Sequence, residues 1–172
     1  ALVAALSVAL CFLCAREIAG AGAALAATAT YALATSMWST AAQALWQHGP
    51  VNAAVLAMTY ALFRAGRARP GGPVAAWLAA AGVCTGLLPV IRPTAVLFSV
   101  AAAIFVVAQF GRRGWWFAAA ALAGVAPGTV WNAVVFHSLV GGYGGDARAY
   151  AFAPLPAFDA LAALLVSPSR GL

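Results

Sequence analysis

The chain is a succession of apolar runs, separated by short segments that hold nearly all of its charged residues. Only 7% of the residues are charged and 65% are hydrophobic, whereas a soluble domain usually has about 25% charged residues. A soluble fold could not cover its surface with so few charges, and disordered chains are poor in apolar residues. The runs are continuous rather than alternating, which favours membrane-spanning helices over transmembrane β-strands. We therefore expect an all-α, polytopic helical membrane protein.

About six of these runs are predicted to cross the membrane, since a helix needs about 20 apolar residues to do so. They cover roughly 1–15, 18–37, 50–63, 74–91, 93–110 and 115–136, and an external segment covers 137–172. The chain begins without methionine, inside an apolar run. This favours an internal fragment of a larger membrane protein, so 1–172 is expected to be a single transmembrane domain fragment.

Six arginines indicate which side of the membrane is cytoplasmic. They follow the first, third and fifth runs: Arg16, then Arg64, Arg67 and Arg69, then Arg112 and Arg113. With alternating crossings these clusters fall on one side, and the positive-inside rule makes that side the cytoplasm. The opposite side receives the other arginines, both histidines and two acids: Arg92, Arg148, Arg170, His48, His137, Asp146 and Asp159. Chemistry is therefore expected on the extracytoplasmic face of the cytoplasmic (inner) membrane.

One or two helices are expected to lie on the membrane surface. The run 50–63 spans only about 21 Å as a helix, which leaves two alternatives. Either Arg64 snorkels while the bilayer thins, or the stretch 36–49, with its two tryptophans, lies at the membrane edge. The second is favoured. Leu155–Val166 has an apolar stripe at helical spacing and predicts another surface helix.

Small residues are abundant in the apolar runs and are expected to permit close helix packing. They include Gly20, Gly22, Gly82, Gly86, Gly124 and Gly128.

Two polar residues stand next to predicted helix starts on the outer face. Arg92 lies in a tight turn predicted at 89–93, and His48 directly precedes Gly49 and Pro50. A guanidinium binds phosphate oxygens bidentately, and a helix N-terminus favours anions. The alternatives are an arginine that snorkels to headgroups and a histidine that only makes interfacial hydrogen bonds.

No cofactor is predicted, although a divalent metal stays open. The glycine-rich loop 141–148 lacks the ending of a phosphate-binding loop. Asp146 and Asp159 are the outward carboxylates, either of which could serve as a base or a metal ligand.

Short motifs in the order of the chain resemble those of a known enzyme family. They are Trp-Gln-His-Gly-Pro at 46–50, Arg-Pro-Thr at 92–94 and Ser-Pro-Ser-Arg-Gly-Leu at 167–172, with WNAVVFHSLVGGYG between the last two. In this order the chain resembles bacterial multi-pass glycosyltransferases related to family 39. These belong to the GT-C superfamily, with the protein O-mannosyltransferases.

This resemblance implies transfer of a sugar from a polyprenyl-phosphate donor to an acceptor on the outer face of the membrane, in a partial GT-C-type membrane domain. Arg92, His48 and Arg170 match the family's motif positions and are expected to contact the donor phosphate or substrate. The family's catalytic acid lies in the first external loop, and no acid precedes Arg16 here. The catalytic residue is therefore unknown and is expected outside the fragment. The segment 138–146 departs from the family pattern, so the acceptor stays unassigned.

Other classes of function stay open at this stage. A multi-pass transporter or facilitator, an O-antigen ligase or polymerase and an inactive membrane scaffold would each be equally apolar. The expected partners are membrane lipids and the lipid-linked donor, and no nucleic acid is expected.

Overall fold

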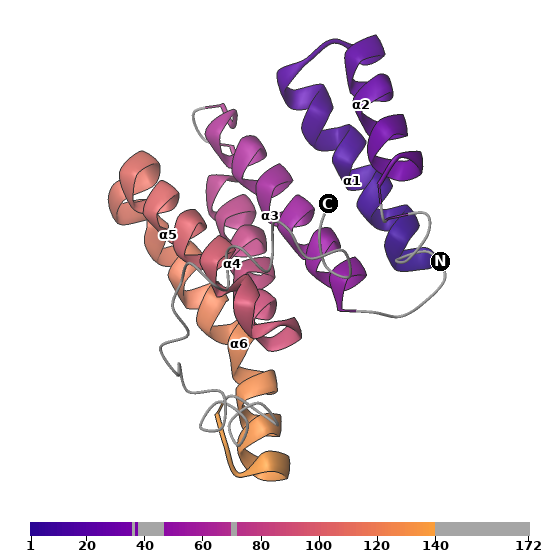
Figure 1. Ribbon diagram of the computed structural model, residues 1–172. Coiled ribbons are helices and arrows are strands. Elements are labelled where there is room, and N and C mark those ends of the chain that lie inside the picture. Colours follow the sequence, from indigo (N-terminus) through magenta and orange to yellow (C-terminus); the bar gives the residue numbers. More distant parts are fainter. Residues whose placement is uncertain (36, 38–46, 70–71, 140–172) are drawn as a thin grey trace, which may run out of the picture. The chain divides into compact units, whose positions relative to one another are not determined.

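The computed structural model describes residues 1–35, 37, 47–69 and 72–139, and within these ranges it contains helices and turns but no strand. The predicted all-α class is confirmed (Figure 1). The chain divides into two compact units, Ala1–Val130 and Trp131–Leu172. The α-helices are α1 (Leu2–Ile18), α2 (Ala21–Leu33), α3 (His48–Gly66), α4 (Val74–Ile91), α5 (Val96–Phe110) and α6 (Trp115–Phe136), with 3-10 turns η2 (Pro93–Ala95) and η3 (Gly111–Gly114).

The helix bounds correct the predicted runs in two places. The run 50–63 is part of α3, which has 19 residues and is about 28 Å long at 1.5 Å per residue. It extends beyond the apolar run at both ends. Pro50 lies in the first turn, where a backbone N–H would have no acceptor within the helix, so its missing N–H costs nothing. Arg64 is tolerated in the last turn. The run 18–37 gives only the 13-residue α2. The predicted surface helices at 36–49 and 155–166 fall almost entirely outside the described residues.

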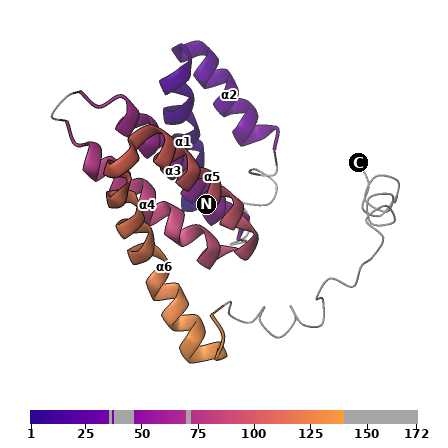
Figure 2. The ribbon, with the colours of Figure 1, turned by 90° about the vertical axis from the view of Figure 1, so that its left-hand side faces the viewer.

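The core of the first unit lies around α3 and α4. These two helices make the most extensive contact and lie side by side in both ribbon views (Figures 1 and 2). Leu78, Ala81 and Leu88 of α4 are completely buried. On the other side of α3, α1 packs against both α2 and α3. α4 is therefore the central element, with its apolar residues covered on several sides.

Glycines bring α4 and α6 into very close contact. A Cβ added to Gly82 would lie 2.2 Å from the carbonyl oxygen of Phe117, and one added to Gly86 would lie 2.1 Å from that of Ala121. A Cβ added to Gly124 of α6 would lie 2.6 Å from the carbonyl oxygen of Val83. Only glycine leaves room for backbones at this distance. The predicted role of small residues in helix packing is confirmed for α4 and α6, and it is wrong for Gly20 and Gly22, where an added Cβ would meet nothing within 4 Å.

The chain reverses direction between α4, α5 and α6. Contacts advance together along α4 and α6, from Gly82 against Phe117 to Val90 against Gly128, so these two helices run parallel. α5, which connects α4 to α6 in the chain, therefore runs in the opposite direction to both. It is bonded to α4, because the hydroxyl of Ser99 donates to the carbonyl oxygen of Thr85 at 2.9 Å. As a result, the α4 to α5 connection and the α5 to α6 connection lie at opposite ends of the bundle.

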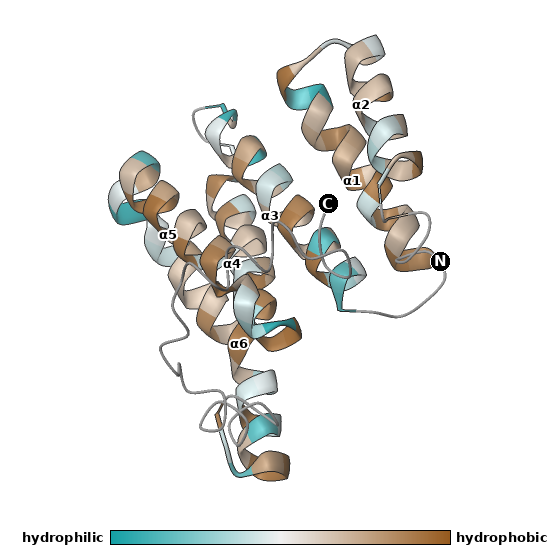
Figure 3. Ribbon diagram, in the orientation of Figure 1, coloured by the Kyte–Doolittle hydropathy of each residue, from teal (hydrophilic) through white to brown (hydrophobic). Residues whose placement is uncertain are grey.

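Two segments are long and apolar enough to cross a membrane, judged by length and composition. They are α4 and the helical run Pro93–Phe136, which η3 interrupts. In the first unit, hydrophilic residues lie mainly at helix ends and the middles are apolar (Figure 3). Large apolar side chains on α5, including Leu97, Ile104 and Val107, are more than 60% exposed.

Candidate functional site

Two of the predicted site residues are in direct contact although 44 positions separate them. The Nη1 atom of Arg92 lies 2.8 Å from Nδ1 of His48 and 3.3 Å from its Nε2. His48 is the first residue of α3, and Arg92 follows the last residue of α4. The antiparallel packing of these helices brings the start of one to the end of the other. We call this contact the His48–Arg92 pair.

The local sequence fixes the backbone of Arg92. Pro93 disfavours helical geometry in the residue before it, and Arg92 is extended, with φ −151° and ψ 118°. Pro93 then opens η2 as its first residue, as its fixed φ favours. The tight turn predicted at 89–93 is shorter than expected, because α4 continues through Pro89 to Ile91. Arg92 alone joins α4 to η2.

The electrostatics around the His48–Arg92 pair favour an anion. The first-turn N–H groups of α3 and of η2 lack intrahelical partners, so each helix start carries positive partial charge. The C-terminal end of α4 in turn favours the cation at Arg92. One guanidinium nitrogen of Arg92 contacts both ring nitrogens of His48. A guanidinium can only donate, so its remaining N–H groups are donors that an anionic ligand could accept.

The opposite end of the first unit is arginine-rich. Here Glu17, at the end of α1, forms an ion pair with Arg67 just after α3, with Nη1 2.6 Å from Oε2. Arg67 Nη2 also donates to the backbone carbonyl of Glu17. The guanidinium of Arg64 lies 5.4 Å from the ring centre of Trp77 and 5.9 Å from that of Tyr60, as in cation–π contacts.

Two pockets open at this arginine-rich end. One has a volume of about 520 Å³ and adjoins the Glu17–Arg67 ion pair. The other, of about 610 Å³, is lined by Arg69, Arg113 and Trp116 among others. Pockets, ion pair and connections together show that the ends of α1, α3 and α5 and the start of α4 meet here. The six arginines that the sequence groups on one side therefore belong to helix ends on one side of the bundle: Arg16, Arg64, Arg67, Arg69, Arg112 and Arg113.

The remaining predicted residues lie outside this arrangement. Arg170, Asp146, Asp159 and the loop 141–148 are outside the described residues. Asn132, near the end of α6, donates locally to the carbonyl oxygen of Leu139 at 3.5 Å.

The sequence reasoning missed the Glu17–Arg67 ion pair and the two pockets. A signal for the ion pair was present in the sequence: Glu17 follows the first run and Arg67 follows the third, and both fall on the same predicted side of the membrane. In the part of the chain that the structure describes, no group of three metal-ligating side chains comes together. The role of His48 and Arg92 in holding a phosphate stays a prediction.

No family model, curated protein or solved structure matches the chain. The family resemblance therefore depends on the short motifs alone, and the function has to be argued from the geometry of the described residues.

Proposed function

We propose that the chain is part of a multi-pass membrane glycosyltransferase of GT-C type that takes its sugar from a polyprenyl-phosphate donor. In this proposal about six helices cross the inner membrane, and the arginine-rich end faces the cytoplasm. The His48–Arg92 pair then lies on the outer face and holds the donor phosphate. The observation that carries the proposal is the 2.8 Å contact between Arg92 and His48.

The distribution of charge supports the membrane placement. α4 joins the two polar ends and, with 18 residues, is about 27 Å long, close to the roughly 30 Å hydrocarbon core of a bilayer. Among the described residues, six arginines at one end and one at the other follow the positive-inside rule for short connections. Exposed apolar residues along α5 suit lipid contact, because a soluble monomer rarely exposes so large an apolar surface.

The chemistry of the pair supports a phosphate ligand. A guanidinium forms short, charge-assisted hydrogen bonds with phosphate oxygens and can bind two of them at once. His48 occupies one side of the Arg92 guanidinium, which orients its remaining N–H groups. A lipid-linked donor would reach this position from the outer leaflet, with its chain along the apolar helices.

Transport coupled to ions is less consistent with the described residues. Ion-coupled transporters place charged or ionisable side chains inside membrane-spanning helices. Within the described ranges, the charged residues of α1 and α3 are confined to their last turns, and α2, α4, α5 and α6 contain none. This leaves a passive facilitator or a lipid-phosphate ligase as the rival functions.

The test is sugar transfer by the full-length protein in membranes, with a polyprenyl-phosphate sugar as donor. Arg92→Ala should lower kcat/KM for the donor by about 10- to 100-fold, the loss expected for charge-assisted hydrogen bonds to phosphate. Arg92→Lys keeps the charge but not the planar fork, so it should recover only part of the activity.

Arg112→Ala is the matched control, because Arg112 is an exposed arginine in η3 at the opposite end. Its transfer rate should equal that of the parent protein. Equal losses in Arg92→Ala and Arg112→Ala, or unchanged donor use in Arg92→Ala, would refute the phosphate role of the pair.

A further inference from the structure

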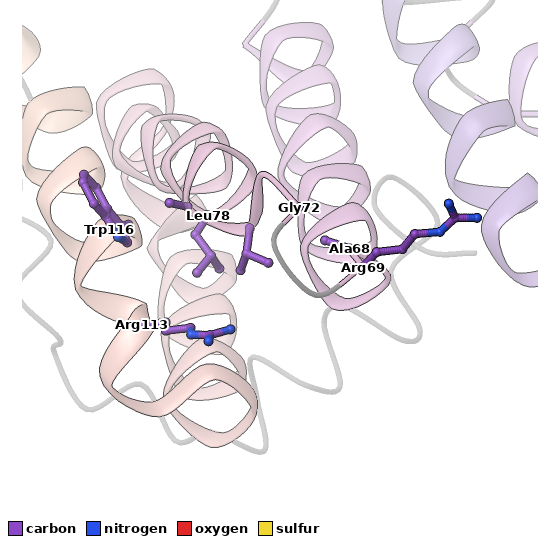
Figure 4. Close-up of a pocket in the computed structure, with 8 residues that line it drawn as sticks. Ala68, Arg69, Gly72, Leu78, Arg113 and Trp116 are labelled. Atoms are coloured by element: carbon purple, nitrogen blue, oxygen red, sulfur yellow. The ribbon is translucent and has the colours of Figure 1, made fainter.

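The 610 Å³ pocket at the arginine-rich end is not needed by the proposed transfer reaction. It lies between the start of α4, the end of α3 and the turn η3. Figure 4 shows Arg113 and Trp116 on one side of Leu78 and Arg69 extending on the other side. Arg69 also lines the neighbouring 520 Å³ pocket, so it stands between the two. Two cations from separate parts of the chain thus border one cavity.

These two cations have no counter-ion within the described ranges. Glu17 is the one acid among the described residues, and its ion pairs are with Arg64 and Arg67. Arg69 and Arg113 therefore leave uncompensated positive charge at the pocket. α4 also begins on the pocket wall, at Val74 and Ala75. The Val74 N–H donates to the carbonyl oxygen of Gly72 at 2.8 Å, and the positive end of the α4 dipole still favours an anion nearby. The pocket is electrostatically suited to an anion.

The rest of the lining is apolar and aromatic. Leu78 closes the inner side of the pocket, and the indole of Trp116 forms part of its wall. Trp115 and Trp116 are 55% and 43% exposed and their ring centres lie 3.8 Å apart. Exposed tryptophans next to arginines are typical of the level at which lipid headgroups lie. A ligand here would meet cations at its head and apolar surface beside it.

We propose that this pocket binds the phosphate of an anionic phospholipid from the leaflet on the arginine-rich side. Arg113 holds the phosphate oxygens, Arg69 adds positive charge at the opposite border of the pocket, and Trp116 lies beside the glycerol and the upper acyl chain. Basic pockets between helices on the cytoplasmic side of membrane proteins suit such headgroups. The inference depends on the proposed membrane placement but not on sugar transfer.

The experiment measures binding to the full-length protein in detergent, by native mass spectrometry and by the thermal shift on titration with short-chain phosphatidylglycerol. One lipid should bind with saturation. Arg113→Gln should weaken its apparent affinity about tenfold, the loss expected for one charge-assisted hydrogen bond. Arg69→Gln should weaken it by less, because the Arg69 side chain extends away from Leu78 and Arg113 (Figure 4) and acts only through its charge.

Arg112→Gln is the matched control: it removes the same charge from the neighbouring position, which does not line the pocket. It should bind the lipid like the parent protein. An equal loss of lipid affinity in the Arg112 and Arg113 variants would show that the lipid is held only by general charge attraction, and would overturn the proposed site. A shift of the same size with glycerol 3-phosphate or inorganic phosphate would overturn the lipid as the source. None of these measurements depends on sugar transfer. The lipid site can therefore be refuted while the transferase proposal stands, and the transferase proposal can be refuted while the lipid site stands.

Discussion

The two ends of the first unit differ in how their positive charges are held. At the arginine-rich end, six arginines come from three connections, and a single acid, Glu17, pairs with two of them. At the other end a single arginine of the described residues, Arg92, lies between two helix ends that contain proline, in contact with the imidazole of His48. Several exposed cations suit a diffuse partner such as a charged membrane surface. One oriented cation suits a defined ligand.

This comparison separates topology from recognition. The loss of any one arginine at the arginine-rich end should leave the orientation in the membrane unchanged, because the positive-inside effect sums over many residues. The His48–Arg92 pair has no such redundancy among the described residues. The predictions below test this difference, beginning with the largest expected effect.

The first prediction concerns which side of the membrane each end occupies. In a variant with its native cysteines replaced by alanine, Thr94→Cys beside the pair should react with a membrane-impermeant maleimide in intact cells. Arg112→Cys should react only after permeabilisation. Both positions are exposed in the fold, so accessibility differs only through the membrane. Labelling of both in intact cells, or the reversed pattern, would contradict the proposed orientation.

The second prediction concerns the glycine contact between α4 and α6, the helices that run from one end of the unit toward the other. Gly86→Ala places a Cβ about 2.1 Å from the Ala121 carbonyl oxygen, which forces α4 and α6 apart at a cost of about 1–3 kcal/mol. The thermal unfolding midpoint of the purified protein should fall accordingly. Gly22→Ala is the control, since nothing lies within 4 Å of its added Cβ, and it should not lower the midpoint.

The third prediction separates the two members of the pair. His48→Ala should lower kcat/KM for the donor by about tenfold, less than Arg92→Ala, because it removes the group that orients the guanidinium and one hydrogen bond of about 1 kcal/mol. His48→Gln retains an oxygen that can accept from Arg92 and should recover most of the activity. A larger loss in His48→Ala than in Arg92→Ala would make the histidine the principal contact.

The smallest effect is expected for Glu17→Gln. The Arg67 side chain is 57% exposed, so solvent screens the pair and its loss should cost at most about 1 kcal/mol of stability. The difference from the parent protein should shrink at high salt. Orientation should not change, because the variant leaves every arginine in place. Reversed labelling in the first experiment with this variant would show that the acid, too, sets topology.

The sequence predicted helices well where apolar character and helix geometry end together. α4 and α6 have the predicted bounds because glycine, proline or charge directly flanks their apolar runs. The third run was misjudged because its apolar residues end before the helix does, at both ends. His48 and Arg64 are polar, yet both continue the backbone pattern of α3. Hydropathy measures lipid preference, whereas helix length follows from hydrogen bonding.

The contact between His48 and Arg92 could be predicted only in part. Counting crossings places both residues on one face. It cannot say that α3 and α4 are the pair in extensive contact, nor that they are rotated so that these side chains meet. Similarly, Gly82 and Gly86 indicate close packing without naming α6 as the partner. Pairwise helix contacts depend on side-chain fit across the whole interface, which local patterns do not contain.

The glycine contact between α4 and α6 limits how these helices can slide past each other. Gly82 and Gly86 are four residues apart, about one helical turn, and the residues between them carry side chains. A shift of α4 by one residue would bring Val83 and Leu87, or Ala81 and Thr85, to the positions where Gly82 and Gly86 now meet the backbone of α6. A shift by a whole turn would bring Leu78 or Val90 to one of these two positions. The two glycines together therefore fix the register of α4 on α6, so any change of shape in this unit has to occur in other parts of it.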